Sequence, residues 1–172
     1  MLDANALRAL QAPLKDRYRS EPEAAVVTLK AEGTLDEASI ACKVETGRAL
    51  AVAGLHPASG GSGAELCSGD MLLEALVACA GVTLKAVATA LGIELRAGRV
   101  RAEGDLDFRG TLGVDKAAPV GFRSVRLAFA IDTDASQDQV DTLIKLTERY
   151  CVVFQTLNHK PELTVDVTQH AA

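Results

Sequence analysis

The sequence is organised around one long apolar stretch, residues Leu66–Leu91. From Met71 to Leu91 only Glu74 and Lys85 carry a charge. A helix that is apolar on almost every side is a buried helix, so this stretch predicts a central helix that the rest of the fold must cover. At 100° per residue, one stripe of the helix has a thiol at its centre; it contains Leu72, Leu76, Cys79, Thr83 and Val87.

Both ends of this stretch carry residues that begin and end helices. Ser68 is a predicted side-chain cap, Asp70 lies where the helix dipole favours an anion, and Gly92 can stop the last turn. The glycine-rich segment His56–Leu66 leads into the helix. It lacks the Gly-Lys-Ser/Thr ending of a phosphate-binding loop, so we interpret it as a flexible connection.

The residues on either side of the central stretch indicate an α+β fold. Short strand-like runs precede it, and runs of alternating polar and apolar residues follow it. The predicted strands are Ala24–Ala31, Ala38–Val44, Arg48–Leu55, Arg99–Phe108, Arg123–Ile131 and Glu162–Thr168, with a turn at Glu32–Thr34. Antiparallel hairpins outnumber parallel crossovers in this order, which favours α+β with antiparallel sheets over a doubly wound α/β fold.

Two further helices are predicted. Asp3–Arg19 reads as a short amphipathic helix, which defines an N-terminal helical extension (residues 1–20) before a single domain (residues 21–172). Ser136 and Gln139 form a capping-box pattern, which predicts a helix from there to about Leu157. Cys151 lies at the centre of the apolar stripe of this helix, as Cys79 does in the first.

The central helix needs cover on nearly every side, and the other elements of one chain are stretched to supply it. We therefore expect a homodimer in which the helices of both chains pack together. The net charge of -5 argues against binding to nucleic acid or to an anionic membrane, because either would need a basic face. We expect no transmembrane helix and no secretory signal, and hence a cytoplasmic protein.

The chain has four cysteines, which are Cys42, Cys67, Cys79 and Cys151. None of them lies in a CxxC or zinc-finger spacing, so no metal site is predicted. In a reducing compartment they are expected as free thiols or redox pairs. A single buried cysteine commonly acts only as a small apolar side chain, and we assign no role to Cys42 or Cys67.

If Cys79 and Cys151 meet, they form a dithiol in a mostly apolar pocket. One thiolate can attack the O–O bond of a peroxide and become a sulfenic acid, and the other thiol can then condense with it to a disulfide. An external dithiol or thiol resets the pair. An apolar pocket raises the pKa of a thiol, so this chemistry requires a nearby cation or hydrogen-bond donor.

Two helical motifs resemble those of the OsmC/Ohr family, the thiol-dependent organic hydroperoxide reductases. LLEALVACAGVTL is similar to the helix of its first cysteine, TERYCVVFQTL to that of its second, and ELTVDV to its closing strand. The resemblance implies an intertwined homodimer in which Cys79 is the peroxidatic cysteine and Cys151 resolves it. It also implies alkyl or fatty hydroperoxides as substrates, a lipoyl-type dithiol as reductant, and no metal or prosthetic group.

The sequence departs from the family around these thiols. The family commonly uses an Arg and a Glu to hold the thiolate and orient the peroxide. Asp70 is the carboxylate nearest to the expected Glu, and His56 and Arg48 are the candidates nearest to the expected Arg. Val152 stands where the family usually has Pro. An alternative hypothesis is therefore a non-catalytic module of the same fold that binds an apolar ligand or senses oxidants; a purely structural dimer is a third.

Overall fold

The structure is a computed structural model that describes residues 3–6, 9, 12, 20, 32–35, 41–45, 50–113 and 115–169, with the backbone alone at 32–35, 41–45 and 50. The predicted strand Ala24–Ala31, Arg48 and most of the N-terminal helix lie outside the described residues. Where the N-terminal segment is described, Asp3 accepts a hydrogen bond of 2.7 Å from the N–H of Ala6 through Oδ1. This bond matches the predicted cap.

The central helix is α2, which spans Ser68–Leu91. Its N-terminal cap is Cys67, without a side-chain hydrogen bond, so the predicted cap at Ser68 is wrong. Gly92 ends the helix with φ of 70°, as predicted, because the left-handed conformation costs glycine little. Full burial is confined to one narrow strip of the helix, formed by Leu76, Ala80, Leu84 and Ala88. One chain therefore covers only one side of α2.

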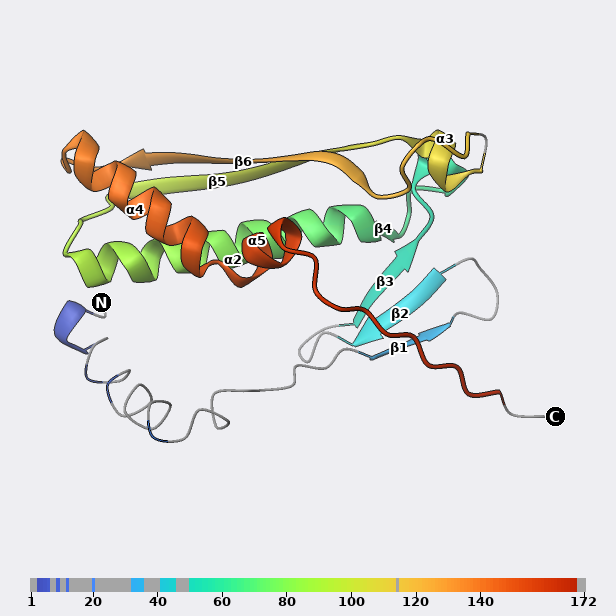
Figure 1. The fold of residues 1–172 in the computed structure, drawn as a ribbon, viewed down its shortest axis with the longest axis horizontal. Helices are drawn as coiled ribbons and strands as arrows, with labels where there is room; N and C mark the ends of the chain where they lie inside the picture. Colours follow the sequence, from blue (N-terminus) through green and yellow to red (C-terminus); the bar gives the residue numbers. More distant parts are fainter. Residues whose placement is uncertain are drawn as a thin grey trace.

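Strands β5 (Ala97–Leu106) and β6 (Phe122–Asp132) form an antiparallel ribbon that lies along α2 (Figure 1). The alternation predicted for both strands is observed. The side facing α2 pairs small residues with large ones, in the register Gly98 with Ile131, Val100 with Phe129, Ala102 with Leu127 and Gly104 with Val125. The other side is polar and carries ion pairs such as Arg126 with Asp105. The ribbon therefore has one face in the core and one in water.

Helices α4 (Gln137–Tyr150) and α5 (Val152–Asn158) pack across α2. The predicted capping box is present, since the Ser136 hydroxyl accepts from the N–H of Gln139 and the Gln139 amide oxygen accepts from that of Ser136. The prediction of one continuous helix to Leu157 is wrong. Cys151 adopts an extended conformation, with φ of −74° and ψ of 107°, and separates two helices.

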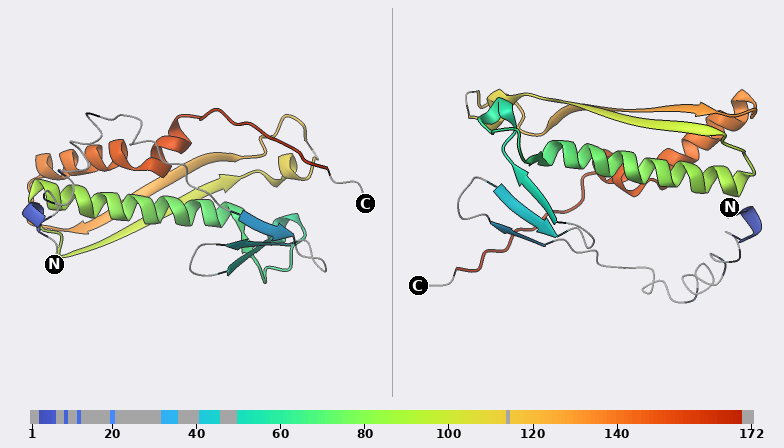
Figure 2. Two further views of the ribbon diagram at one scale, coloured as in Figure 1. Left: turned by 90° about the horizontal axis from the view of Figure 1, so that it is seen from below. Right: turned by 180° about the vertical axis from the view of Figure 1, so that it is seen from behind.

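A second sheet lies off the N-terminal end of α2 (Figure 2). Its order is β1 (Glu32–Leu35), β2 (Ala41–Glu45), β3 (Leu50–Gly54) and β4 (Leu66–Cys67), with β3 and β4 parallel. The predicted turn at Glu32–Thr34 is wrong, because these residues belong to β1. Among the described side chains, this sheet contributes none to the two buried clusters of the core.

The C-terminal segment leaves the fold after α5. Residues 160–169 form neither helix nor strand, so the predicted closing strand Glu162–Thr168 is absent within one chain. Its apolar side chains are exposed, with Leu163 at 74%, Val165 at 89% and Val167 at 86%. These three residues alternate with polar ones, which is the pattern of a strand that covers an apolar surface.

Among the described residues, α2 alone is long and apolar enough to cross a membrane. Its contacts with β5, α4 and α5 place it in the core of the fold instead. What marks α2 as a core helix is its packing.

Candidate redox site

The fold brings Cys79 and Cys151 together, although 72 residues separate them in the sequence (151 − 79). Cys151 is completely buried in a cluster with Leu76 and Ala80. Cys79, the residue before Ala80 in α2, packs against this cluster. The two side chains are hydrogen-bonded to each other. Both are free thiols. The arrangement is that of a reduced dithiol.

The break between α4 and α5 exposes backbone donors at this pair. A continuous helix would direct the N–H groups of residues 152–154 to carbonyls four residues back. Because the helix stops at Cys151, those N–H groups lack helical partners. The side-chain amide of Gln155 donates a hydrogen bond of 2.8 Å to the carbonyl of Glu148, which also lacks a helical partner here. The freed N–H groups are directed at the two sulfur atoms.

Hydrogen bonds hold the pKa of Cys79 below that of an ordinary thiol. Burial acts to raise this pKa, but the N–H of Val153, the thiol of Cys151, the N–H of Val152 and the hydroxyl of Thr83 together outweigh it. Each of these donors stabilises the thiolate rather than the thiol. Cys79 is therefore the sulfur that ionises first.

The pKa of Cys151 is shifted the other way. Burial raises it, the N–H of Phe154 partly opposes that effect, and the neighbouring Cys79 sulfur raises it further. A second negative charge beside a thiolate is unfavourable. Cys151 therefore keeps its proton and donates it in a hydrogen bond to Cys79. The two sulfurs form one coupled site with two distinct roles.

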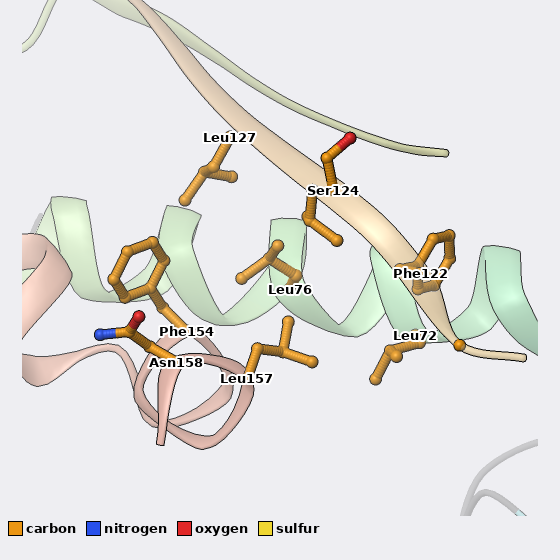
Figure 3. Close-up of a pocket in the computed structure, with 10 residues that line it drawn as sticks. Leu72, Leu76, Phe122, Ser124, Leu127, Phe154, Leu157 and Asn158 are labelled. Carbon is orange, nitrogen blue, oxygen red and sulfur yellow. The ribbon is translucent and has the colours of Figure 1, made fainter. Parts of the chain in front are cut away.

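A mostly apolar cavity of about 540 Å³ lies next to the cluster that encloses Cys151, and Figure 3 shows residues that line it. It shares Leu76, Leu127 and Phe154 with the cluster that encloses Cys151. From there it extends along α2 toward Leu72 and Phe122. The polar side chains on its wall are those of Ser124 and Asn158. The lining of the cavity suits an apolar molecule.

The other candidate residues lie away from the sulfurs. Asp70 is exposed in the first turn of α2, nine residues before Cys79, or about 13 Å along the helix axis. His56 caps the short helix η2 (Pro57–Ser59), and its ring stacks on Phe108 with centroids 5.0 Å apart. Phe108 begins α3 (Phe108–Thr111), at the far end of the β5–β6 ribbon. Arg48 lies outside the described residues.

Sequence reasoning missed the donors that hold Cys79. It searched for a charged side chain, whereas the structure supplies the backbone N–H groups of Val152 and Val153. No side-chain pattern marks the break, since Val152 and Val153 themselves begin α5 and every residue other than proline has a backbone N–H. Within the described part of the chain, no group of three or more His, Cys, Asp or Glu side chains could hold a metal ion.

Comparisons with known proteins agree with this fold. The sequence model of the family described as OsmC-like protein matches residues 61–166. An OsmC-like protein from Mycoplasma pneumoniae has a similar structure, with a TM-score of 0.65, 19% identity, and coverage of 78% of this chain and 89% of that one. An organic hydroperoxide resistance protein OsmC from Legionella pneumophila has a TM-score of 0.60 and 18% identity, with coverage of 77% of this chain and 90% of that one. An organic hydroperoxide resistance protein from Elizabethkingia anophelis has a TM-score of 0.61 and 16% identity, with coverage of 79% of this chain and 91% of that one. No curated protein sequence matches significantly.

The first prediction concerns the pH dependence of the two thiols. The thiolate absorbance of Cys79 is the part of the signal that is missing in Cys79→Ser. It should titrate with a midpoint below that of an ordinary thiol, because the donors favour ionised Cys79. The thiolate population therefore rises with pH and is already formed below the usual thiol range. In Cys151→Ala one donor is lost, so the Cys79 midpoint should move upward. An unchanged midpoint in Cys151→Ala would contradict the hydrogen bond between the sulfurs.

The second prediction isolates the backbone donor at residue 152. Val152→Pro removes the N–H that faces Cys79, while proline is well tolerated at the first position of a helix. The Cys79 midpoint should rise in ultraviolet thiolate titration. Val152→Ala is the matched control, because it changes the same exposed side chain and keeps the N–H. Equal midpoints in the two variants would show that this N–H does not hold the thiolate.

Proposed function

Because this chain belongs to the OsmC family, we propose that it is a thiol-dependent peroxidase that reduces organic hydroperoxides through Cys79 and Cys151. The observation that carries the proposal is the hydrogen-bonded pair of unequal thiols, with an apolar cavity beside it. Two proteins of similar fold are described as organic hydroperoxide resistance proteins, which supports the same class of reaction.

In the proposed reaction, the Cys79 thiolate attacks the terminal oxygen of the hydroperoxide. The O–O bond breaks, the alcohol leaves after taking up a proton, and Cys79 becomes a sulfenic acid. The Cys151 sulfur then attacks the Cys79 sulfur, a disulfide forms, and the hydroxyl leaves as water with the Cys151 proton. The two thiols supply the two electrons that reduce the peroxide. An external dithiol or thiol restores the pair by exchange.

The local hydrogen bonds suit these roles. A thiolate in an apolar cluster needs stabilisation, and the N–H groups of Val152 and Val153 provide it without a charged side chain. Cys151 remains protonated next to it, which keeps the second thiol unreactive until the sulfenic acid forms. The chemistry is carried by sulfur alone, so the proposal includes no cofactor. A cytoplasmic location, where thiol reductants are present, fits this cycle.

The proposed assembly is a homodimer. The side of α2 turned away from the buried strip leaves an apolar side chain exposed, with Val82 at 72%. The apolar side chains of the C-terminal segment are exposed too. Exposed apolar surface of this extent marks an interface. A second copy of the chain supplies both the helices and the strands that would cover it.

The third prediction is the stoichiometry of peroxide reduction. Adding a slight excess of cumene hydroperoxide to the reduced protein should remove two free thiols per chain, since one disulfide forms. Cys79→Ser should lose this reaction, and Cys151→Ser should stop at the sulfenic acid, which a dimedone adduct detects by mass spectrometry. Cys67→Ser is the control, because this thiol lies at the start of α2 and should leave the reaction unchanged.

Other outcomes of this experiment separate the hypotheses. If parent and Cys79→Ser lose thiols equally fast, the peroxidase proposal fails. If no thiol is lost but an apolar ligand binds, the chain is a non-catalytic module of the same fold. The apolar cavity is the observation that favours this second candidate.

The fourth prediction tests the dimer. The parent should have the mass of two chains in light scattering after size exclusion, and Val165→Asp should shift it toward one chain. The new charge would be buried at the apolar side of the C-terminal segment, which is unfavourable. Thr164→Asp is the matched control on the opposite side. A parent with the mass of one chain, or equal effects of the two variants, would contradict this assignment.

A further inference from the structure

The ring of Phe122 lies directly against the backbone of Gly104. A Cβ atom added at Gly104 would come within 2.6 Å of Cδ1 of Phe122, which real Cβ atoms essentially never do. Gly104 is not among the described glycines with positive φ. The glycine is therefore required for space rather than for backbone conformation. A larger residue at position 104 would force the ring of Phe122 to move.

A β-bulge aims Phe122 at this position. Leu106 pairs with Phe122 and Asp105 with Ser124, so Arg123 has no partner on β5. In a regular strand without a bulge, alternation would point Phe122 to the polar side of the ribbon, opposite to Val125 and Leu127. The bulge turns it to the apolar side instead. There its Cζ atom would lie 3.5 Å from a Cβ added at Gly69, in the first turn of α2.

Phe122 stands at one end of the apolar cavity, and Leu127 and Phe154, which belong to the cluster around Cys151, stand at the other (Figure 3). Along α2 the cavity is lined by Leu76, three residues from Cys79, and by Leu72, which lies beside Phe122. Seven residues of helix separate Leu72 from Cys79, which is about 10 Å along the axis. A linear chain whose reactive end lies at Cys79 would therefore meet the ring of Phe122 with its other end.

We propose that Phe122, seated on Gly104, is the end wall of this cavity and determines the length of alkyl chain that the site accepts. The occupant is the apolar chain of a linear hydroperoxide, so the inference rests on the proposed function. Gly104 acts through Phe122 and is a positioning residue. The pair thus determines specificity without touching the sulfurs.

The fifth prediction uses a series of n-alkyl hydroperoxides. In the parent, kcat/KM should rise from butyl to octyl by up to about fourfold per buried methylene and stop rising toward dodecyl. Gly104→Ala pushes the ring into the cavity and should reduce the preference for octyl over butyl by about tenfold or more, mainly through KM. Phe122→Ala removes the wall, so the rise should continue to dodecyl.

A double variant and a matched control make the test specific. In the double variant, the methyl group added by Gly104→Ala has no ring to displace, because Phe122→Ala has removed it. Gly104→Ala should therefore change the chain-length preference of Phe122→Ala by no more than about twofold. Gly98→Ala lies on the same strand, where its Cβ meets only ordinary contacts of 3.8 Å, and should leave the chain-length profile unchanged. Phe122→Leu, which keeps an apolar side chain, serves if the alanine variants fail to fold. An equal loss for all chain lengths in Gly104→Ala would overturn the proposal.

Binding of the corresponding n-alkanols separates the two proposals, because it requires no thiol chemistry. Calorimetry should show tighter binding up to octanol in the parent, and Gly104→Ala should abolish that gain. If no thiol reacts with peroxide while this pattern is seen, the proposed function fails and the end wall stands. If thiols react but neither rates nor binding depend on chain length, the end wall fails and the function stands.

Discussion

The geometry of the thiol pair depends on one interruption of the helical backbone at Cys151. The extended conformation of this residue ends α4 and frees the N–H groups that hydrogen-bond to Cys79. It also places the Cys151 thiol beside the same sulfur. The difference in pKa between the two thiols, and with it the order in which they are expected to react, follows from the break.

The interruption is tolerated because its polar groups are satisfied. A buried N–H without a partner costs about 1–3 kcal/mol, and here the sulfur atoms accept from the N–H groups while Gln155 serves the carbonyl of Glu148. An ordinary helix at this point would be locally more favourable but would leave Cys79 with fewer donors. The site thus exchanges helical hydrogen bonds for hydrogen bonds to a thiolate.

The sequence was sufficient to predict what periodicity controls. The central helix, the alternation of both ribbon strands and the capping box at Ser136 are all present. Three things were beyond it, each for a physical reason. The break at Cys151 was not predicted, because the donors that it frees are backbone N–H groups and these have no residue signature. Phe122 faces the core because a bulge shifts the alternation by one residue. The segment Glu162–Thr168 has the alternation of a strand but is unpaired, because alternation alone does not specify a partner edge.

The separation of the two thiols along the chain has a consequence for the order of events in synthesis. Cys79 is made 72 residues before Cys151 (151 − 79), and contacts across such a span form late in folding, after local helices and hairpins. Until α5 docks against α2, each cysteine has the reactivity of an ordinary thiol. The lowered pKa of Cys79 is therefore acquired only after α5 has been made and has docked against α2, and before that point the chain carries two ordinary thiols.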